Sequence, residues 1–134
     1  MEEYINVIVK EPGKAPVEIT IRNELAPLND LVDGYIETVS WDSRHVLIVN
    51  EEGKLRHMEC NFLRRNMDMI VGTAVWAGVD GEDLVSVAPG LLEEVAEETG
   101  YGPDAEEDIL ACGDLEDILA ELLGGDGEIR RILV

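Results

Sequence analysis

Residues 69–79, with the sequence MIVGTAVWAGV, form the longest apolar run of the chain. β-Branched and aromatic residues favour a strand, and the absence of charged residues predicts that this strand lies in the core. Gly72 and Gly78 inside the run indicate a bulge or the close approach of another backbone segment. The other expected elements are placed around this core strand.

Strand patterns also occur on both sides of the core run. The Pro-Gly turn at residues 11–14 joins the first two into a hairpin. Residues 45–50 (HVLIVN) have no polar break between Val46 and Val49, which predicts an inner strand covered on both faces. The expected strands are residues 3–10, 16–22, 35–41, 45–50 and 83–87, with a further candidate at 129–134.

One short helix is expected before the core run. Asn23 is a suitable N-cap for residues 24–32, whose leucines recur at helical spacing, and Gly34 is the expected stop. Residues 55–68 show no regular period, and we expect an irregular surface connection there.

An acidic region follows the core run. Residues 91–128 contain fourteen carboxylates and no Lys or Arg, yet apolar residues recur among them at helical spacing. Glycines divide the region into expected helices near 90–99, 104–112 and 115–123. An acidic face fixed by an apolar stripe differs from a solvated acidic tail, which lacks such a stripe.

The pattern as a whole predicts an α+β fold. We expect a mostly antiparallel sheet of five or six strands, a short helix on one face and an acidic helical C-terminal part. Residues 1–88 would form the β-rich core domain, and residues 89–134 an acidic helical extension packed on it.

The net charge of −20 and the pI near 4.1 bear on partners. Such a surface repels nucleic acid and anionic membranes and attracts basic proteins. The alternative is that the charge serves solubility alone. The N-terminus has no signal-peptide pattern, no run is long enough to span a membrane, and two cysteines do not make a secreted framework. We therefore expect a cytoplasmic protein.

Six separated motifs occur together in one order: EPGK at 11–14, the Leu-rich helix, GYIE at 34–37, NEEGKL at 50–55, VGTA at 71–74 and GVDGED at 78–83. Over about residues 4–88 the chain thereby resembles the family of domain of unknown function 3846. That resemblance implies a setting in phages and mobile elements, in some cases beside antirestriction genes, and implies no catalytic residues. The acidic region and residues 56–60 depart from the family pattern.

His57 and Cys60 are three residues apart and could share a metal ion, with Glu59, Cys112 or His45 as further ligands. A zinc site normally shows two ligand pairs, so the alternative is an exposed His beside a half-buried Cys. Zinc is the only cofactor that the sequence suggests.

Other candidate residues have simpler interpretations. Arg64 and Arg65 could bind phosphate or pair with nearby carboxylates. Trp41 and Trp76 lie in expected strands and are expected in the core rather than as base-stacking platforms. The chain has no P-loop, nucleophile elbow, HExxH or dinucleotide turn, so no enzymatic activity is expected.

The leading functional hypothesis is a phage or mobile-element protein that inhibits a host defence nuclease, of CRISPR or restriction type. Its acidic surface would occupy the basic nucleic-acid site of that nuclease. The apolar stripe at 109–123 would dock within the chain or form a dimer interface. The alternative is a metal-stabilised or ligand-sequestering module. The expected contact residues are Glu93, Glu94, Glu97, Glu98, Glu106, Glu107, Asp108, Glu116, Asp117 and Glu121.

Overall fold

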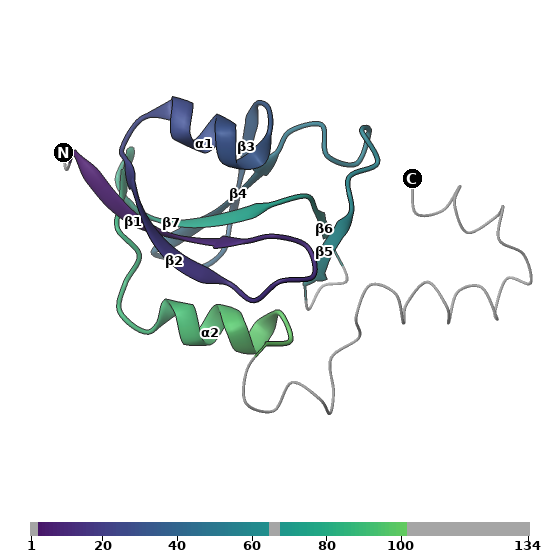
Figure 1. The fold of residues 1–134 in the computed structure, drawn as a ribbon. Coiled ribbons are helices and arrows are strands. Elements are labelled where there is room, and N and C mark those ends of the chain that lie inside the picture. The colour runs from purple at the N-terminus through teal and green to yellow at the C-terminus, as the bar shows by residue number, and fades with distance from the viewer. Residues whose placement is uncertain (1–2, 65–67, 102–134) are drawn as a thin grey trace, which may run out of the picture.

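The computed structural model describes residues 3–64 and 68–101 of the chain. Within them, one antiparallel sheet has the strand order β2-β1-β7-β4-β3, with β8 paired to β7, and β5 and β6 form a separate hairpin. Helices α1 and α2 lie on opposite faces of the sheet (Figure 1). The elements are β1 (Tyr4–Lys10), β2 (Val17–Arg22), α1 (Leu25–Val32), β3 (Ile36–Ser40), β4 (His45–Asn50), β5 (Cys60–Leu63), β6 (Met69–Val71), β7 (Ala74–Asp80), β8 (Asp83–Val85) and α2 (Leu91–Glu98).

Strand β7 is the middle strand and contributes to a core on each face of the sheet. Val75 and Ala77 pack on one side, and Ala74 and Trp76 pack on the other, because successive side chains of a strand point to opposite faces. All four side chains are fully buried. The sheet is therefore covered on both faces, and the inner position expected for residues 45–50 is confirmed by β4, which lies between β7 and β3.

The first core lies under α1. Leu28 and Val32 of the helix pack against buried side chains of the sheet, which include Val7 and Val75. The helix ends at Asp33, which has the left-handed conformation (φ 59°) common at helix ends. The Asn50 amide donates to the carbonyl oxygens of Val32 and Asp33, both at 3.0 Å, and so fastens this end of the helix to β4.

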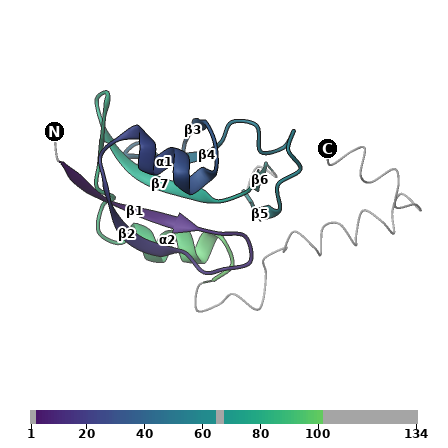
Figure 2. The same cartoon turned by 45° about the horizontal axis from the view of Figure 1, so that its top comes forward.

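The second core lies under α2 and the β5–β6 hairpin, which cover the other face (Figure 2). Phe62 of the hairpin stacks on Trp76 with ring centroids 5.7 Å apart, and Trp41 meets Trp76 edge-on at 5.5 Å. Such aromatic contacts add to the hydrophobic gain of burial. Trp76 is thus a core residue, as expected, and Trp41 packs at the margin of the same cluster.

A buried polar contact ties the hairpin to the sheet. Lys10 Nζ donates to Asn61 Oδ1 at 2.6 Å, and the Asn61 amide donates back to the carbonyl oxygens of Lys10 and Gly72 at 2.7 and 2.8 Å. Burial lowers the pKa of Lys10 from 10.5 to about 8. The ring of Tyr101 also lies 4.9 Å from the ammonium. The end of β1, the hairpin and the segment after α2 therefore meet at this lysine.

Two expectations for this part of the chain were wrong. The run 69–79 is not one strand, because Gly72 adopts φ +72° and separates β6 from β7, which belong to different sheets. Residues 55–68 are not wholly irregular, because they contain β5, whose Asn61 and Phe62 are buried. Gly78 does mark a close approach, since a Cβ there would lie 2.5 Å from the carbonyl oxygen of Ser86.

The expected cap of α1 was also wrong. The helix begins at Leu25 with Glu24 at the N-cap position, and no side chain caps it. The side-chain amide of Asn23 instead donates to the carbonyl oxygen of Leu84 at 3.1 Å. The side chain of Asn23, which the local sequence predicted to cap α1, thus makes a tertiary contact with β8.

The α+β fold with a mostly antiparallel sheet is confirmed, and α2 confirms a helix near 90–99. The expected helices near 104–112 and 115–123 and the strand candidate at 129–134 lie outside the described residues. Neither helix of the described part is long and apolar enough to cross a membrane.

Candidate functional site

Helix α2 carries the acidic residues that the structure describes. It starts after Gly90, whose φ of +91° turns the chain into the helix. Leu91 and Val95, one helical turn apart, are buried in the second core. At the other end the hydroxyl of Thr99 donates to the carbonyl oxygen of Val95 at 2.7 Å. The helix is therefore held against the sheet along one side.

The acids of α2 lie on the side away from this core. Glu93, Glu94 and Glu97 are exposed, and Glu98 is half-buried. Carboxylates near a helix N-terminus are stabilised by the helix dipole, which favours Glu93 and Glu94, whereas Glu97 near the C-terminus gains nothing from it. A cation supplied by a partner would suit this end of the helix best.

No described Lys or Arg pairs with the three exposed acids of α2. Several basic side chains in the described part are used elsewhere, as in the ion pairs Lys14–Glu11, Lys54–Asp68 and Arg56–Asp33. Arg64 lies over the ring of Trp41 at 5.1 Å and donates to the carbonyl oxygen of Ser40. The two roles expected for Arg64, binding phosphate or pairing with a carboxylate, stay predictions, and Arg65 lies outside the described residues.

Four of the ten expected contact residues are thus placed, and they share one short helix. The other six, and the apolar stripe at 109–123, lie outside the described residues, and their roles stay predictions. These six are Glu106, Glu107, Asp108, Glu116, Asp117 and Glu121.

The structure places His57 and Cys60, the residues proposed to bind metal, in different surroundings. His57 is exposed in the turn after β4 and has φ +54°. Cys60 is disulfide-bonded, so it presents no free thiolate, and Cys112 lies outside the described part. In residues 3–64 and 68–101, no three His, Cys, Asp or Glu side chains come together as a metal site.

His45 has both ring nitrogens engaged. Nδ1 lies 2.9 Å from Asp42 Oδ1, and the backbone N–H of Ala88 donates to Nε2 at 3.0 Å. Nε2 is thus the acceptor, and Nδ1 carries the proton that it donates to Asp42. Because Nε2 is occupied, this His–Asp pair links the turn before β4 to the segment before α2 and does not offer a free general base.

Asp42 is the anchor of that link. Partial burial by itself raises the pKa of Asp42, but hydrogen bonds from the backbone N–H of Arg44 and from His45 outweigh it, and the net effect lowers the pKa. The short sequence Asp42-Ser43-Arg44-His45 contains this contact, between the strands expected at residues 35–41 and 45–50. The Ala88 N–H, 43 residues further along, is what defines its role.

Comparison with known proteins identifies a family. The model of the family described as Domain of unknown function (DUF3846) matches residues 5–100, and no curated protein and no solved structure matches. The match extends past residue 88, where the resemblance in the sequence ended, and it includes all of α2. The division into domains at residue 88 stays a prediction.

Proposed function

The chain belongs to the DUF3846 family, and from that premise we propose that it acts by binding, without chemistry, through the acidic face of α2. The partner is a protein whose surface is rich in Lys and Arg. Opposite charge on two surfaces speeds their encounter and fixes their orientation. Nucleic acid and anionic membranes are excluded as partners because both carry the same sign of charge.

The observation that supports this function is the fixed geometry of α2. Leu91 and Val95 are buried in the core, so the three exposed acids of the helix keep their spacing before any partner arrives. Binding then costs little ordering of the backbone, whereas a loose acidic tail would lose conformational entropy on binding. Pre-formed carboxylates without cations are what a basic partner needs.

The finer form of the proposal names the partner as a nuclease of host defence, of CRISPR or restriction type, in the cytoplasm of the host cell. It depends on the phage and mobile-element setting that the family resemblance implies. A nuclease must hold the DNA or RNA backbone in a basic channel, and a rigid acidic surface can occupy that channel in competition with nucleic acid. The mechanism needs no catalytic residue in the inhibitor.

The test neutralises the acidic face without changing its shape. In the α2 variant, Glu93→Gln, Glu94→Gln and Glu97→Gln remove three charges. In the control, Glu18→Gln, Glu59→Gln and Glu82→Gln remove three charges from exposed positions outside α2. The two variants have the same net charge, so a difference between them reports the location of the charge.

Each protein is used as bait in a lysate of the host at low and at high salt, and any captured nuclease is then assayed for cleavage of its own substrate. We expect the unmodified protein and the control to capture and inhibit the nuclease in a salt-sensitive manner, and the α2 variant to bind at least about 10-fold more weakly. Equal capture and inhibition by the two variants would refute the proposal.

A further inference from the structure

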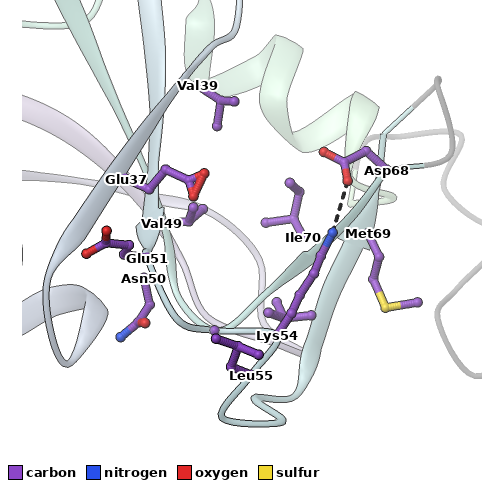
Figure 3. A pocket seen from close by; sticks show the side chains of 12 residues that line it. Glu37, Val39, Val49, Asn50, Glu51, Lys54, Leu55, Asp68, Met69 and Ile70 are labelled. Carbon is purple, nitrogen blue, oxygen red and sulfur yellow. Dashed lines mark hydrogen bonds and ion pairs between the residues drawn. The ribbon is translucent and has the colours of Figure 1, made fainter. Parts of the chain in front are cut away.

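A pocket of about 220 Å³ opens on the second face of the sheet, and none of the residues that line it belongs to α2. It lies between the β3–β4 pair on one side and β6 on the other, with the turn after β4 closing one end (Figure 3). The side chains of Glu37 and Ile70 point into it from opposite sides. The strands that form its two walls belong to different sheets, and Gly72 separates β6 from the central strand.

The lining of the pocket combines apolar and charged side chains. Glu37 on β3 is directly opposite Val49 on β4, and Val39 is opposite Leu47, so Glu37, Val39 and Val49 face the same side of the sheet. Ile70 supplies the facing wall. Leu55 at the edge is 79% exposed, so the apolar lining continues onto open surface.

Charge inside the pocket is not balanced. On one wall Lys54 Nζ forms an ion pair with Asp68 Oδ1 at 3.3 Å, so these two charges offset each other. Glu51 also lines the pocket but points away from it (Figure 3). Glu37 is exposed, and among the described residues no Lys, Arg or His pairs with its carboxylate, which lies beside the apolar side chains of the pocket.

From this arrangement we propose that the pocket binds a small organic cation, an amine attached to an apolar body. The ammonium group would lie at the carboxylate of Glu37, and the apolar body would pack between Val39, Val49 and Ile70. The volume is below the range of pockets for drug-sized ligands and suits about ten non-hydrogen atoms. An anion of the same size would meet Glu37 with the wrong sign, since Lys54 is already held by Asp68.

Three probes of one shape and different charge test the proposal. They are 2-phenylethylamine, its neutral analogue 2-phenylethanol and its anionic analogue phenylacetate, each titrated into the full-length protein and followed by amide chemical shifts in NMR spectra. For so small a ligand we expect amine affinity on the order of millimolar. The amine should bind about 10-fold more tightly than the alcohol, phenylacetate should not bind, and the shifted amides should be those of the pocket walls.

Two matched variants separate the pocket from the general negative charge of the protein. Glu37→Gln removes the pocket carboxylate, and Glu18→Gln removes an exposed carboxylate of β2, with the same change in net charge. We expect Glu37→Gln to bind the amine no better than the alcohol and Glu18→Gln to behave as the unmodified protein. The proposal is overturned if the two variants have equal effects or if the three probes bind with equal affinity. It is also overturned if the shifted amides lie outside the pocket, or if no amide shifts at 20 mM probe, a concentration about 20-fold above the expected Kd.

The pocket and the acidic face are independent. Glu37→Gln leaves α2 unchanged, so loss of amine binding in this variant with full partner binding would identify two separate sites. Loss of partner binding in the α2 variant, with amine binding intact, would also show that the two sites are separate.

Discussion

The buried contact between Lys10 and Asn61 gives the sharpest test of how this fold is held together. Asn61 is 8% exposed and Lys10 is fully buried. The change Asn61→Ala removes the closest acceptor of the Lys10 ammonium, whose contacts to the carbonyl oxygens of Glu11 and residue 61 are both 3.5 Å long, and it removes the donor to the carbonyl oxygens of Lys10 and Gly72. It therefore leaves the buried ammonium with these longer contacts and takes one hydrogen bond from each of the two carbonyl groups.

The expected cost follows from those three lost bonds. A neutral hydrogen bond contributes about 1 kcal/mol and one to a charged group about 1.5–3 kcal/mol, and buried groups left unpaired raise the cost. We expect Asn61→Ala to lower the free energy of unfolding by about 3–5 kcal/mol, which is a large part of the 5–15 kcal/mol of a typical domain. In the Lys10→Met variant the buried charge is absent, so adding Asn61→Ala to that variant should cost about 1–2 kcal/mol less than adding it to the unmodified protein.

Urea unfolding followed by tryptophan fluorescence measures the free energy of unfolding of these variants. Trp76 is a suitable reporter because it is fully buried beside the β5–β6 hairpin, which the Lys10–Asn61 contact ties to the sheet. The control is Asn6→Ala, since Asn6 is exposed and its side-chain oxygen accepts from the Thr20 hydroxyl at 2.7 Å, while its backbone hydrogen bonds to Ser86 and Val87 do not depend on the side chain. The cost of Asn6→Ala should stay below about 0.5 kcal/mol. The reasoning fails if the two alanine variants are equally stable, or if the effects at Asn61 and Lys10 simply add.

Further predictions concern pH and packing. The pKa of Lys10 is 10.5 in the unfolded chain and about 8 in the fold, so the unfolded chain binds more protons between these two pH values. The free energy of unfolding should therefore rise with pH across that range, by at most about 1.4 kcal/mol per pH unit. Lys10→Met should lack this rise. Asp42 has a lowered pKa, so its contribution is present above the ordinary value of 3.8 and is lost as pH falls through the folded value; an acid unfolding curve of Asp42→Asn parallel to that of the unmodified protein would contradict this. Gly78→Ala places a methyl group 2.5 Å from the Ser86 carbonyl oxygen and should cost about 2–4 kcal/mol in urea unfolding, where a loss under 1 kcal/mol would show that the two segments can separate. Val95→Ala should cost about 2–3 kcal/mol and weaken partner binding by loosening α2, so a destabilised variant with unchanged affinity would separate the helix from the function.

Local patterns in the chain were sufficient for most strands. The turn at 11–14 formed as expected, with Gly13 at φ +75° and the Lys14 N–H donating to the Glu11 carbonyl oxygen at 3.1 Å. The unbroken apolar run of β4 predicted an inner strand, and β2 falls within the strand expected at residues 16–22. These features depend on neighbours within a few residues, which is why sequence periodicity detects them.

Candidate sites were less accessible to the same reasoning. The exposed acids of α2 could be found from composition and helical spacing. The pocket could not, because Glu37 becomes a pocket residue only when the β5–β6 hairpin packs over the second face of the sheet. Similarly, the sequence offered His45 only as a possible metal ligand, and the contact of its Nε2 with the distant Ala88 N–H appears only in the structure.

The sequence by itself determined the antiparallel α+β class, the negative charge and the acidic side of α2, because these follow from local periodicity and residue type. Only the tertiary structure decided that residues 69–79 divide between two sheets at Gly72, that residues 60–63 form a strand, and that Asn23 contacts β8 and does not cap α1. The physical reason is that short segments have weak local preferences, and contacts between segments far apart in the chain contribute more free energy than those preferences do.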